Sequence, residues 1–310
     1  MSVGPERDFV GYGPNPPDPK WPGGARLAVN FVLNYEEGSE PSFPDGDGVS
    51  ETGLTELGTA ASGVAGRDLA AETMFEYGAR VGVWRLLRLF RERDLPLTVF
   101  ACARALARNT AVADAIREAD YDVCAHGLRW VRHTDLDEAE ERRQIAAAHA
   151  DIAALTGAPP AGWYCRYAAG LNTRRLVAEH GGFLYDSDSY ADELPYWTEV
   201  SGRPHLVVPY SLAANDTKFV RGGMSVGRQF AEFLSDSVEM LLAEGEEHPR
   251  MLSIGLHARV IGHPGRAMAF ARFLDDLANR EGVWITRRVD IARHWMDVHP
   301  AASRSAGEAA

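Results

Sequence analysis

Residues 121–130 read Tyr-Asp-Val-Cys-Ala-His-Gly-Leu-Arg-Trp. Over residues 121–125, Tyr, Val and Ala alternate with Asp and Cys, which predicts a β-strand of about five residues ending at His126. In α/β folds the loops that follow the strands carry the active site. A lone histidine at such a position usually bonds to nearby backbone, so its meaning depends on how the other predicted strands end.

A second predicted strand covers residues 26–35, Arg-Leu-Ala-Val-Asn-Phe-Val-Leu-Asn-Tyr. Its nearly continuous apolar character predicts burial on both faces of a sheet. The strand ends in Glu36-Glu37-Gly38, which is either a solvated acidic turn or a second group of reactive side chains. Residues 39–73 are rich in Gly, Ser, Thr, Pro and acids, and we expect them to form a long loop, with at most short helices, over the mouth of the fold.

Further along the chain, predicted strands alternate with predicted helices, as in parallel βα units. Polar side chains close at least five of the strands: Glu36 and Glu37, His126, Arg166, Asp186 and Asp188, and His257. An open sheet would bind its ligand at one switch point, whereas a barrel brings all of its strand ends to one rim. We therefore predict an α/β fold that is a single distorted (β/α) barrel of about seven strands.

The composition divides the chain into three segments. Residues 1–25 contain six prolines and form a Pro/Gly-rich N-terminal arm, which Tyr12 and Trp21 are expected to anchor. Residues 26–299 form the barrel domain, and residues 300–310 form a flexible tail.

Charge and composition exclude several classes of partner. The formal net charge of −12 argues against nucleic acid and against an anionic membrane surface. We find no apolar run of membrane-spanning length and no apolar core of a signal peptide. The three cysteines form neither a disulfide framework nor a metal-type pair. We expect a cytoplasmic protein with a small-molecule substrate and with no nucleic-acid or membrane partner.

The ordered set of strand-end motifs resembles that of the polysaccharide deacetylases. In that family an acidic pair, a histidine pair, an arginine motif, an aspartate motif and a Leu-x-His motif follow one another. The matching stretches here are Asn34–Gly38, His126–Trp130, Trp163–Arg166 followed by Asn172-Thr173, Tyr185–Asp188, and Leu256-His257. The resemblance covers roughly residues 26–295 and implies the deacetylase-like barrel.

Two of the family's metal-ligand positions are altered. Trp130 stands where the second metal-binding histidine would be, and Trp has no ligand atom to offer. Glu37 replaces the metal-binding aspartate, and Glu36 replaces the aspartate that acts as base. A catalytic zinc usually has three protein ligands, but only Glu37 and His126 remain here. We therefore predict no metal cofactor, with zinc as the alternative if another residue completes the site.

Loss of the metal site together with an intact acid, histidine and arginine framework resembles the metal-independent allantoinases, a branch of the same family. The similar stretches are Asp8–Gly13, Phe31–Gly38, Tyr77–Leu87 and Phe183–Trp197. The resemblance implies a homotetramer that opens the hydantoin ring of allantoin to give allantoate. Residues 165–171 depart from that branch, so the substrate is either allantoin or a related hydantoin or cyclic imide.

Ring-amide hydrolysis needs an activated water and a protonated leaving nitrogen, and we assign these roles as follows. Glu36 is the predicted general base, kept ionised by Arg166, and His257 is the predicted general acid. Asp186 or Asp188 would hold the tautomer of His257. An ion pair of Arg166 with Asp188 that only braces the rim is an alternative with almost equal support.

His126 would position the substrate or stabilise the oxyanion. The remaining predicted substrate-binding residues are Glu37, Trp130, Tyr164 and Asp186, with Trp130 stacking on a flat ring. Three hypotheses remain: a metal-independent cyclic amide hydrolase, a metal-dependent N-deacetylase acting on a polysaccharide or a small amide, and a non-catalytic barrel that binds a partner in its acidic cleft.

Overall fold

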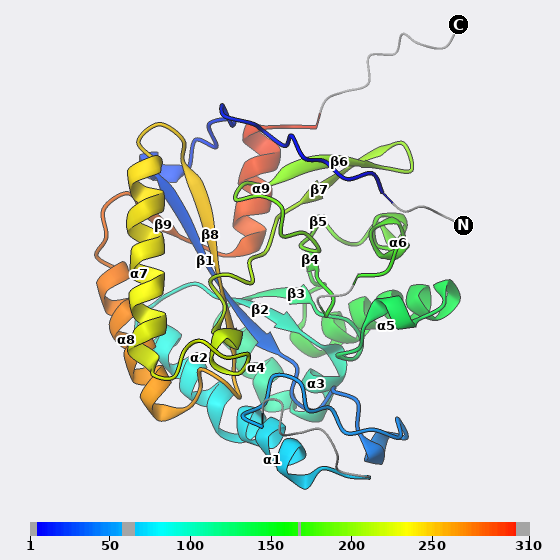
Figure 1. The fold of residues 1–310 in the computed structure, drawn as a ribbon. Helices are drawn as coiled ribbons and strands as arrows, with labels where there is room; N and C mark the ends of the chain where they lie inside the picture. The colour runs from blue at the N-terminus through cyan, green and yellow to red at the C-terminus, as the bar shows by residue number, and fades with distance from the viewer. Residues whose placement is uncertain (1–4, 58–65, 167–168, 302–310) are drawn as a thin grey trace, which may run out of the picture.

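In the computed structural model, which describes residues 5–57, 66–166 and 169–301, one curled sheet organises the chain (Figure 1). Its strand order is β6-β7-β5-β4-β3-β2-β1-β8, with β9 also paired to β1. β6 and β7 form an antiparallel hairpin, and the other pairings are parallel. The strands are β1 (Leu27–Tyr35), β2 (Thr98–Ala101), β3 (Asp122–Ala125), β4 (Gly162–Trp163), β5 (Tyr185–Asp186), β6 (Tyr196–Val200), β7 (Arg203–Val207), β8 (Arg250–His257) and β9 (Val283–Ile285).

The central strand is β1, and every one of its residues is buried. β8 pairs with β1 along almost the whole length of β1. On the other edge of β1, β9 pairs with its first residues and β2 with its last residues. Because both faces are covered and both edges are hydrogen-bonded, an apolar side chain is favoured at nearly every position. The near-continuous apolar run of residues 26–35 is explained by this central place in the sheet.

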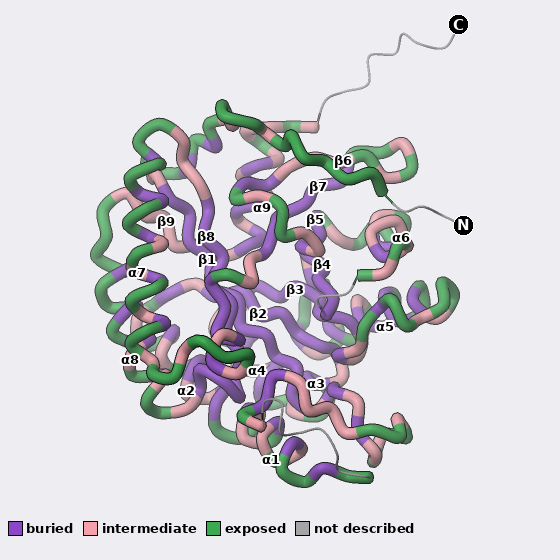
Figure 2. Tube along the Cα trace, viewed as in Figure 1, coloured by how far each residue is buried: buried purple, intermediate pink, exposed green. Residues whose placement is uncertain are grey.

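Helices cover the outside of the curled sheet. They are α1 (Leu69–Tyr77), α2 (Val83–Arg91), α3 (Ala103–Arg108), α4 (Thr110–Glu118), α5 (Glu138–Thr156), α6 (Thr173–His180), α7 (Gly227–Glu244), α8 (Pro264–Leu277) and α9 (Arg288–Val298). A π-helical turn, Gly78–Gly82, joins α1 to α2. Figure 2 shows buried residues concentrated along the strands and exposed residues on the outer faces of the helices. None of the helices in the described parts of the chain has the length and apolar character needed to cross a bilayer.

The predicted α/β architecture is confirmed, with differences in detail. The sheet has nine strands rather than about seven, partly because the hairpin strand β6 was not predicted. The single helix predicted over residues 104–119 is two helices that meet at Asn109. Over residues 39–73, where a loop with at most short helices is predicted, the nine-residue helix α1 begins at Leu69 with Asp68 as its N-cap.

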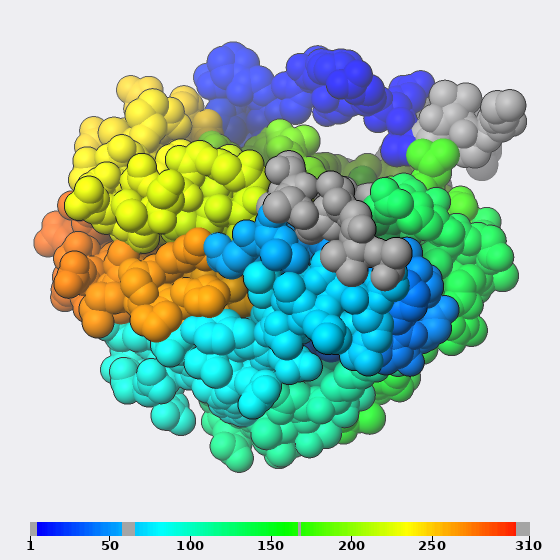
Figure 3. Space-filling model, turned by 60° about the horizontal axis from the view of Figure 1, so that its bottom comes forward, coloured from blue at the N-terminus to red at the C-terminus, as the bar shows by residue number. Residues whose placement is uncertain are grey.

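The N-terminal arm crosses one end of the molecule, with an opening beneath it in Figure 3. In the same view α7 and α8 lie side by side on the outer surface. Trp21 is buried and donates its indole N–H to the carbonyl of Arg250 at 3.0 Å. Tyr12 donates its hydroxyl to the carbonyl of Pro195 at 2.7 Å. Both aromatic residues expected to anchor the arm therefore do so.

Candidate active site

Strand register brings three of the predicted site residues to one rim. Tyr35 pairs with Ala101, which pairs with Ala125, which pairs in turn with Trp163. The residues that follow three of these four, Glu36, His126 and Tyr164, therefore leave the sheet at the same level. On the other side of β1, Asn34 pairs with His257, which adds the second histidine.

These side chains line a small cavity of about 20 Å³, which has room for one water molecule. Six of the predicted site residues lie in its wall: Glu36, His126, Trp130, Tyr164, Arg166 and His257. The remaining lining residues are Asn34, Leu54, Tyr210, Leu212, Asn215, Thr217 and Arg221. Leu54 belongs to the loop that was expected to cover the mouth, and it contributes to the wall of the cavity.

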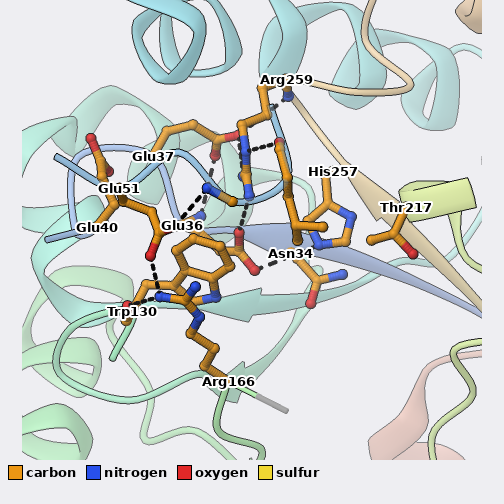
Figure 4. Close-up of polar contacts among 12 residues, drawn as sticks. Asn34, Glu36, Glu37, Glu40, Glu51, Trp130, Arg166, Thr217, His257 and Arg259 are labelled. Carbon is orange, nitrogen blue, oxygen red and sulfur yellow. Dashed lines mark hydrogen bonds and ion pairs between the residues drawn. The ribbon is translucent and has the colours of Figure 1, made fainter. Parts of the chain in front are cut away.

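Glu36 lies at the centre of the polar contacts (Figure 4). Its Oε2 accepts from Arg259 at 2.6 Å, and its Oε1 lies 3.1 Å from His126 Nε2 and 3.6 Å from His257 Nε2. The other nitrogen of His126 lies 3.1 Å from the carbonyl of Tyr164, so it donates there. Burial opposes the charge on Glu36, but Arg259 and the two histidines outweigh it and hold the pKa of Glu36 well below its ordinary range.

His257 is held by a carboxylate that the sequence analysis did not select, Asp216. Its Nδ1 lies 2.6 Å from Asp216 Oδ1, and the other Asp216 oxygen accepts from the backbone N–H of His257 at 2.7 Å. Burial opposes the charge of His257, but Asp216 and Glu36 outweigh burial and raise its pKa to about 9. His257 is therefore an imidazolium at neutral pH, with its Nε2–H directed towards the cavity and Glu36.

Arg259 also fixes Glu37, which does not line the cavity. Glu37 Oε1 accepts from the side chain and from the backbone N–H of Arg259, each at 3.2 Å. Gly78 packs so closely on Glu37 that a Cβ at residue 78 would lie 2.5 Å from the carboxylate. Glu37 therefore anchors the guanidinium that holds Glu36, and its role in substrate binding stays a prediction.

Arg166 lines the cavity but does not contact Glu36. Its guanidinium bonds to Glu51 at 2.5 Å and to the carbonyl of Trp130 at 3.3 Å. Its Cζ lies 3.8 Å from the centre of the Trp130 ring. Figure 4 shows the two side chains lying against each other. Two predictions are corrected here: Arg259, not Arg166, keeps Glu36 ionised, and the face of Trp130 proposed for a substrate ring is covered by a guanidinium.

Asp186 and Asp188 lie outside the cavity wall. Asp186 is bound by Arg174 at 2.7 Å and by His205 at 2.8 Å. Asp188 accepts from the backbone N–H of Cys165 at 3.0 Å. The prediction that one of them holds His257 is therefore wrong, as is the alternative of an Arg166–Asp188 ion pair. Asp188 instead braces the end of β4 that leads to Arg166, and Asp186 ties β5 to α6 and β7.

Comparison with known proteins identifies the family. A polysaccharide deacetylase family model matches residues 66–185. A Schizosaccharomyces pombe protein named putative polysaccharide deacetylase is 36% identical, over 95% of this chain and 98% of its own. The chain belongs to the polysaccharide deacetylase family. A probable polysaccharide deacetylase from Pseudomonas aeruginosa PAO1 is 49% identical with a TM-score of 0.92, covering 96% of this chain and 100% of its own. The structure of PuuE allantoinase is 48% identical with a TM-score of 0.91, covering 97% of this chain and 100% of its own.

The deacetylase-like (β/α) barrel predicted from the sequence is thereby confirmed, since both solved relatives superpose over nearly the whole chain. The family's zinc, however, does not fit the residues present at the site. Trp130 lies beside His126 without offering a ligand atom, and both Glu36 and Glu37 are bound by the guanidinium of Arg259. Within residues 5–57, 66–166 and 169–301, no group of three His, Cys, Asp or Glu side chains is placed to hold a metal ion.

Sequence reasoning missed Arg259 and Asp216, the charged partners of Glu36 and His257, in this deacetylase-family chain. It also missed the polar lining residues Asn34, Tyr210, Asn215, Thr217 and Arg221. Arg259 comes two positions after His257, and a cation so close to a strand-end histidine was a usable signal. Asp216 lies in the polar run Asn215–Thr217, whose place beside β8 comes from an isolated pairing of Asn215 with Gly255. That pairing joins segments 40 residues apart, so no local pattern reveals it.

Proposed function

We propose that this deacetylase-family hydrolase opens a cyclic amide, allantoin to allantoate or a related hydantoin or cyclic imide, with Glu36 as general base and His257 as general acid. The observation that carries the proposal is the buried chain Asp216–His257–Glu36–Arg259. It pairs an ionised carboxylate with an imidazolium across one cavity. The similarity to PuuE allantoinase over 97% of the chain supports the same reaction class.

The division of roles follows from the two shifted pKa values. Glu36 stays ionised, so it can remove a proton from a water molecule in the cavity as that water adds to the ring carbonyl. The C–N bond then breaks, its electron pair moves to nitrogen, and His257 Nε2 donates the proton that this nitrogen needs. The water oxygen ends in the new carboxyl group, and the nitrogen carries one more hydrogen than before. Glu36 passes the proton that it took from water to the neutral His257, so both groups return to their starting states and one water is consumed.

A low pKa makes Glu36 a weak base, so the carbonyl that the activated water attacks must be reactive. The carbonyls of ureides and imides are more electrophilic than those of ordinary amides, which suits a base of this kind. Arg259 supplies a fixed positive charge next to Glu36, whereas a metal-dependent deacetylase would place its ion near the same carboxylates. The N-deacetylase alternative is favoured by the names of two relatives and disfavoured by this donor set.

The experiment is a substrate panel of allantoin, hydantoin, succinimide, dihydrouracil and chitotetraose, with and without a chelator. We expect ring opening of at least one cyclic amide, with a rate that the chelator does not change. Acetate released from chitotetraose, lost with chelator and restored by zinc, would establish the N-deacetylase instead. If the wild-type protein turns over none of these amides, with or without added zinc, the hypothesis of a non-catalytic barrel that binds a partner is supported.

A further inference from the structure

The floor of the cavity is built by polar groups below the level of the proposed acid and base. Asn34 precedes Glu36 by two residues on β1, and Gly255 precedes His257 by two residues on β8. A Cβ at Gly255 would overlap the hydroxyl of Tyr210. The Tyr210 hydroxyl therefore occupies the space that the missing side chain of Gly255 leaves, one layer beneath His257.

Hydrogen-bond accounting fixes the orientation of the floor amides. Asn34 Nδ2 donates to the carbonyl of Leu256 and to the Tyr210 hydroxyl, each at 3.1 Å. Asn215 Nδ2 donates to the same hydroxyl at 3.1 Å, while its Oδ1 accepts from the backbone N–H of Thr217 at 3.0 Å. Because a carbonyl can only accept and a backbone N–H can only donate, neither amide can be reversed. The Tyr210 oxygen therefore accepts two hydrogen bonds.

Two groups of this floor are left without partners. A tyrosine hydroxyl has two lone pairs and one proton, and both lone pairs of Tyr210 are used. In the parts of the chain that the structure describes, no acceptor takes the Tyr210 proton and no donor reaches Asn34 Oδ1. Burial raises the pKa of Tyr210, so its proton stays in place. Free hydrogen-bonding positions on two buried residues, beside a cavity that both residues line, indicate a bound polar molecule.

We propose that Tyr210 and Asn34 recognise one edge of the substrate ring: Tyr210 O–H donates to a carbonyl oxygen, and Asn34 Oδ1 accepts from the adjacent N–H. The proposal rests on the proposed function and specifies how the ring lies. The cavity has room for one water molecule, so the ring edge replaces that water and the cavity wall moves outward to admit the rest of the ring. In a small ring the amide is cis, so its C=O and N–H lie on the same edge. In an N-acetylated sugar the amide is trans, and the two groups point in opposite directions. The floor therefore selects a cyclic amide against an acetamido group.

The protein-side test replaces Tyr210 by Phe and uses Tyr185→Phe as its matched control. Tyr185 is also buried, but it lies against Gly162 and the Cys124 thiol, outside the cavity wall. We expect Tyr210→Phe to lower kcat/KM at least about fivefold, and Tyr185→Phe to leave it unchanged. Hydantoin binding is measured by calorimetry in a Glu36→Gln background, where the same loss should appear in Kd. The Phe substitution also removes the acceptor for the side-chain amides of Asn34 and Asn215, which can lower stability. The thermal midpoint of each variant is therefore measured, and all assays are run below it.

The substrate-side test needs no variant and compares hydantoin with 1-methylhydantoin and 3-methylhydantoin. Methylating the N–H that faces Asn34 should lower kcat/KM at least about 100-fold, whereas methylating the other nitrogen should be tolerated. Equal rates for all three rings, or an unchanged Tyr210→Phe, would overturn the floor assignment while leaving ring hydrolysis intact. If hydantoin binds in a way that depends on Tyr210 but its ring is not opened, the proposed function is overturned, while recognition of the ring edge by Tyr210 and Asn34 stands. Absence of both binding and turnover would overturn both.

Discussion

The Asp216→Asn substitution is the most informative change. It removes the negative charge that stabilises the His257 imidazolium and leaves the proposed general acid, His257, in place. The wild-type pKa of His257 is about 9, against an ordinary value of 6.5. This difference corresponds to about 3 kcal/mol in favour of the imidazolium, at about 1.4 kcal/mol per pH unit. Burial opposes the charge, so the carboxylates of Asp216 and Glu36 together supply more than that amount. Without Asp216, we expect the pKa to fall by at least about two pH units.

The assay is the pH dependence of kcat/KM on the best cyclic amide. For wild type we expect a plateau from acid to neutral pH and a fall as pH rises through about 9, where His257 loses its proton. For Asp216→Asn the fall should come near the ordinary histidine pKa. At pH 8.5 the variant should therefore be about 100-fold slower, and near pH 5.5 much closer to wild type.

The free energy of unfolding should also decrease as His257 loses its proton. A histidine whose folded pKa is raised adds stability that is complete below its unfolded pKa of 6.5 and is lost as pH rises through about 9. The free energy of unfolding of wild type should thus fall over this interval, and that of Asp216→Asn should fall less. Asp122→Asn is the control, because Asp122 is a buried carboxylate at the opposite end of its strand, bonded to Thr98. If Asp216→Asn lowers kcat/KM by the same factor at every pH, or if the fall of kcat/KM at alkaline pH stays near pH 9, then Asp216 does not raise the pKa of His257.

Five further changes test the remaining claims. Glu36→Gln and His257→Ala should each lower kcat at least about 100-fold with unchanged circular dichroism, and near-wild-type turnover in either would remove that role. Arg259→Met leaves two buried carboxylates without their cation, so chemical denaturation should show a loss of about 3–5 kcal/mol, and an equally stable variant would contradict the clamp. Gly82→Ala places a Cβ on a backbone carbonyl after β8, so unfolding free energy should drop by about 1–3 kcal/mol; an unchanged value would show that the π-helical turn yields. Deleting residues 1–22 should lower the proposed tetrameric state in light scattering, which a monomeric full-length chain would disprove.

The sequence by itself determined the elements and the rim. The apolar run of residues 26–35 can only be satisfied by a strand covered on both faces, and β1 is that strand. Parallel strands in register end at one level, so residues that follow predicted strands are brought together without knowledge of loops. Glu36, His126 and His257 were found in this way, and all three line the cavity.

Only the tertiary structure decided which charged groups pair with one another. The sequence contains several arginines and aspartates near strand ends, and pattern alone assigns Arg166 to Glu36 and Asp186 or Asp188 to His257. Folding instead brings Arg259 to Glu36 and Asp216 to His257. The physical reason is that strand and helix periodicities are local, whereas the partner of a buried charge depends on where crossover loops return. A loop segment such as the one carrying Asp216 shows its place only when the sheet that it packs against has formed.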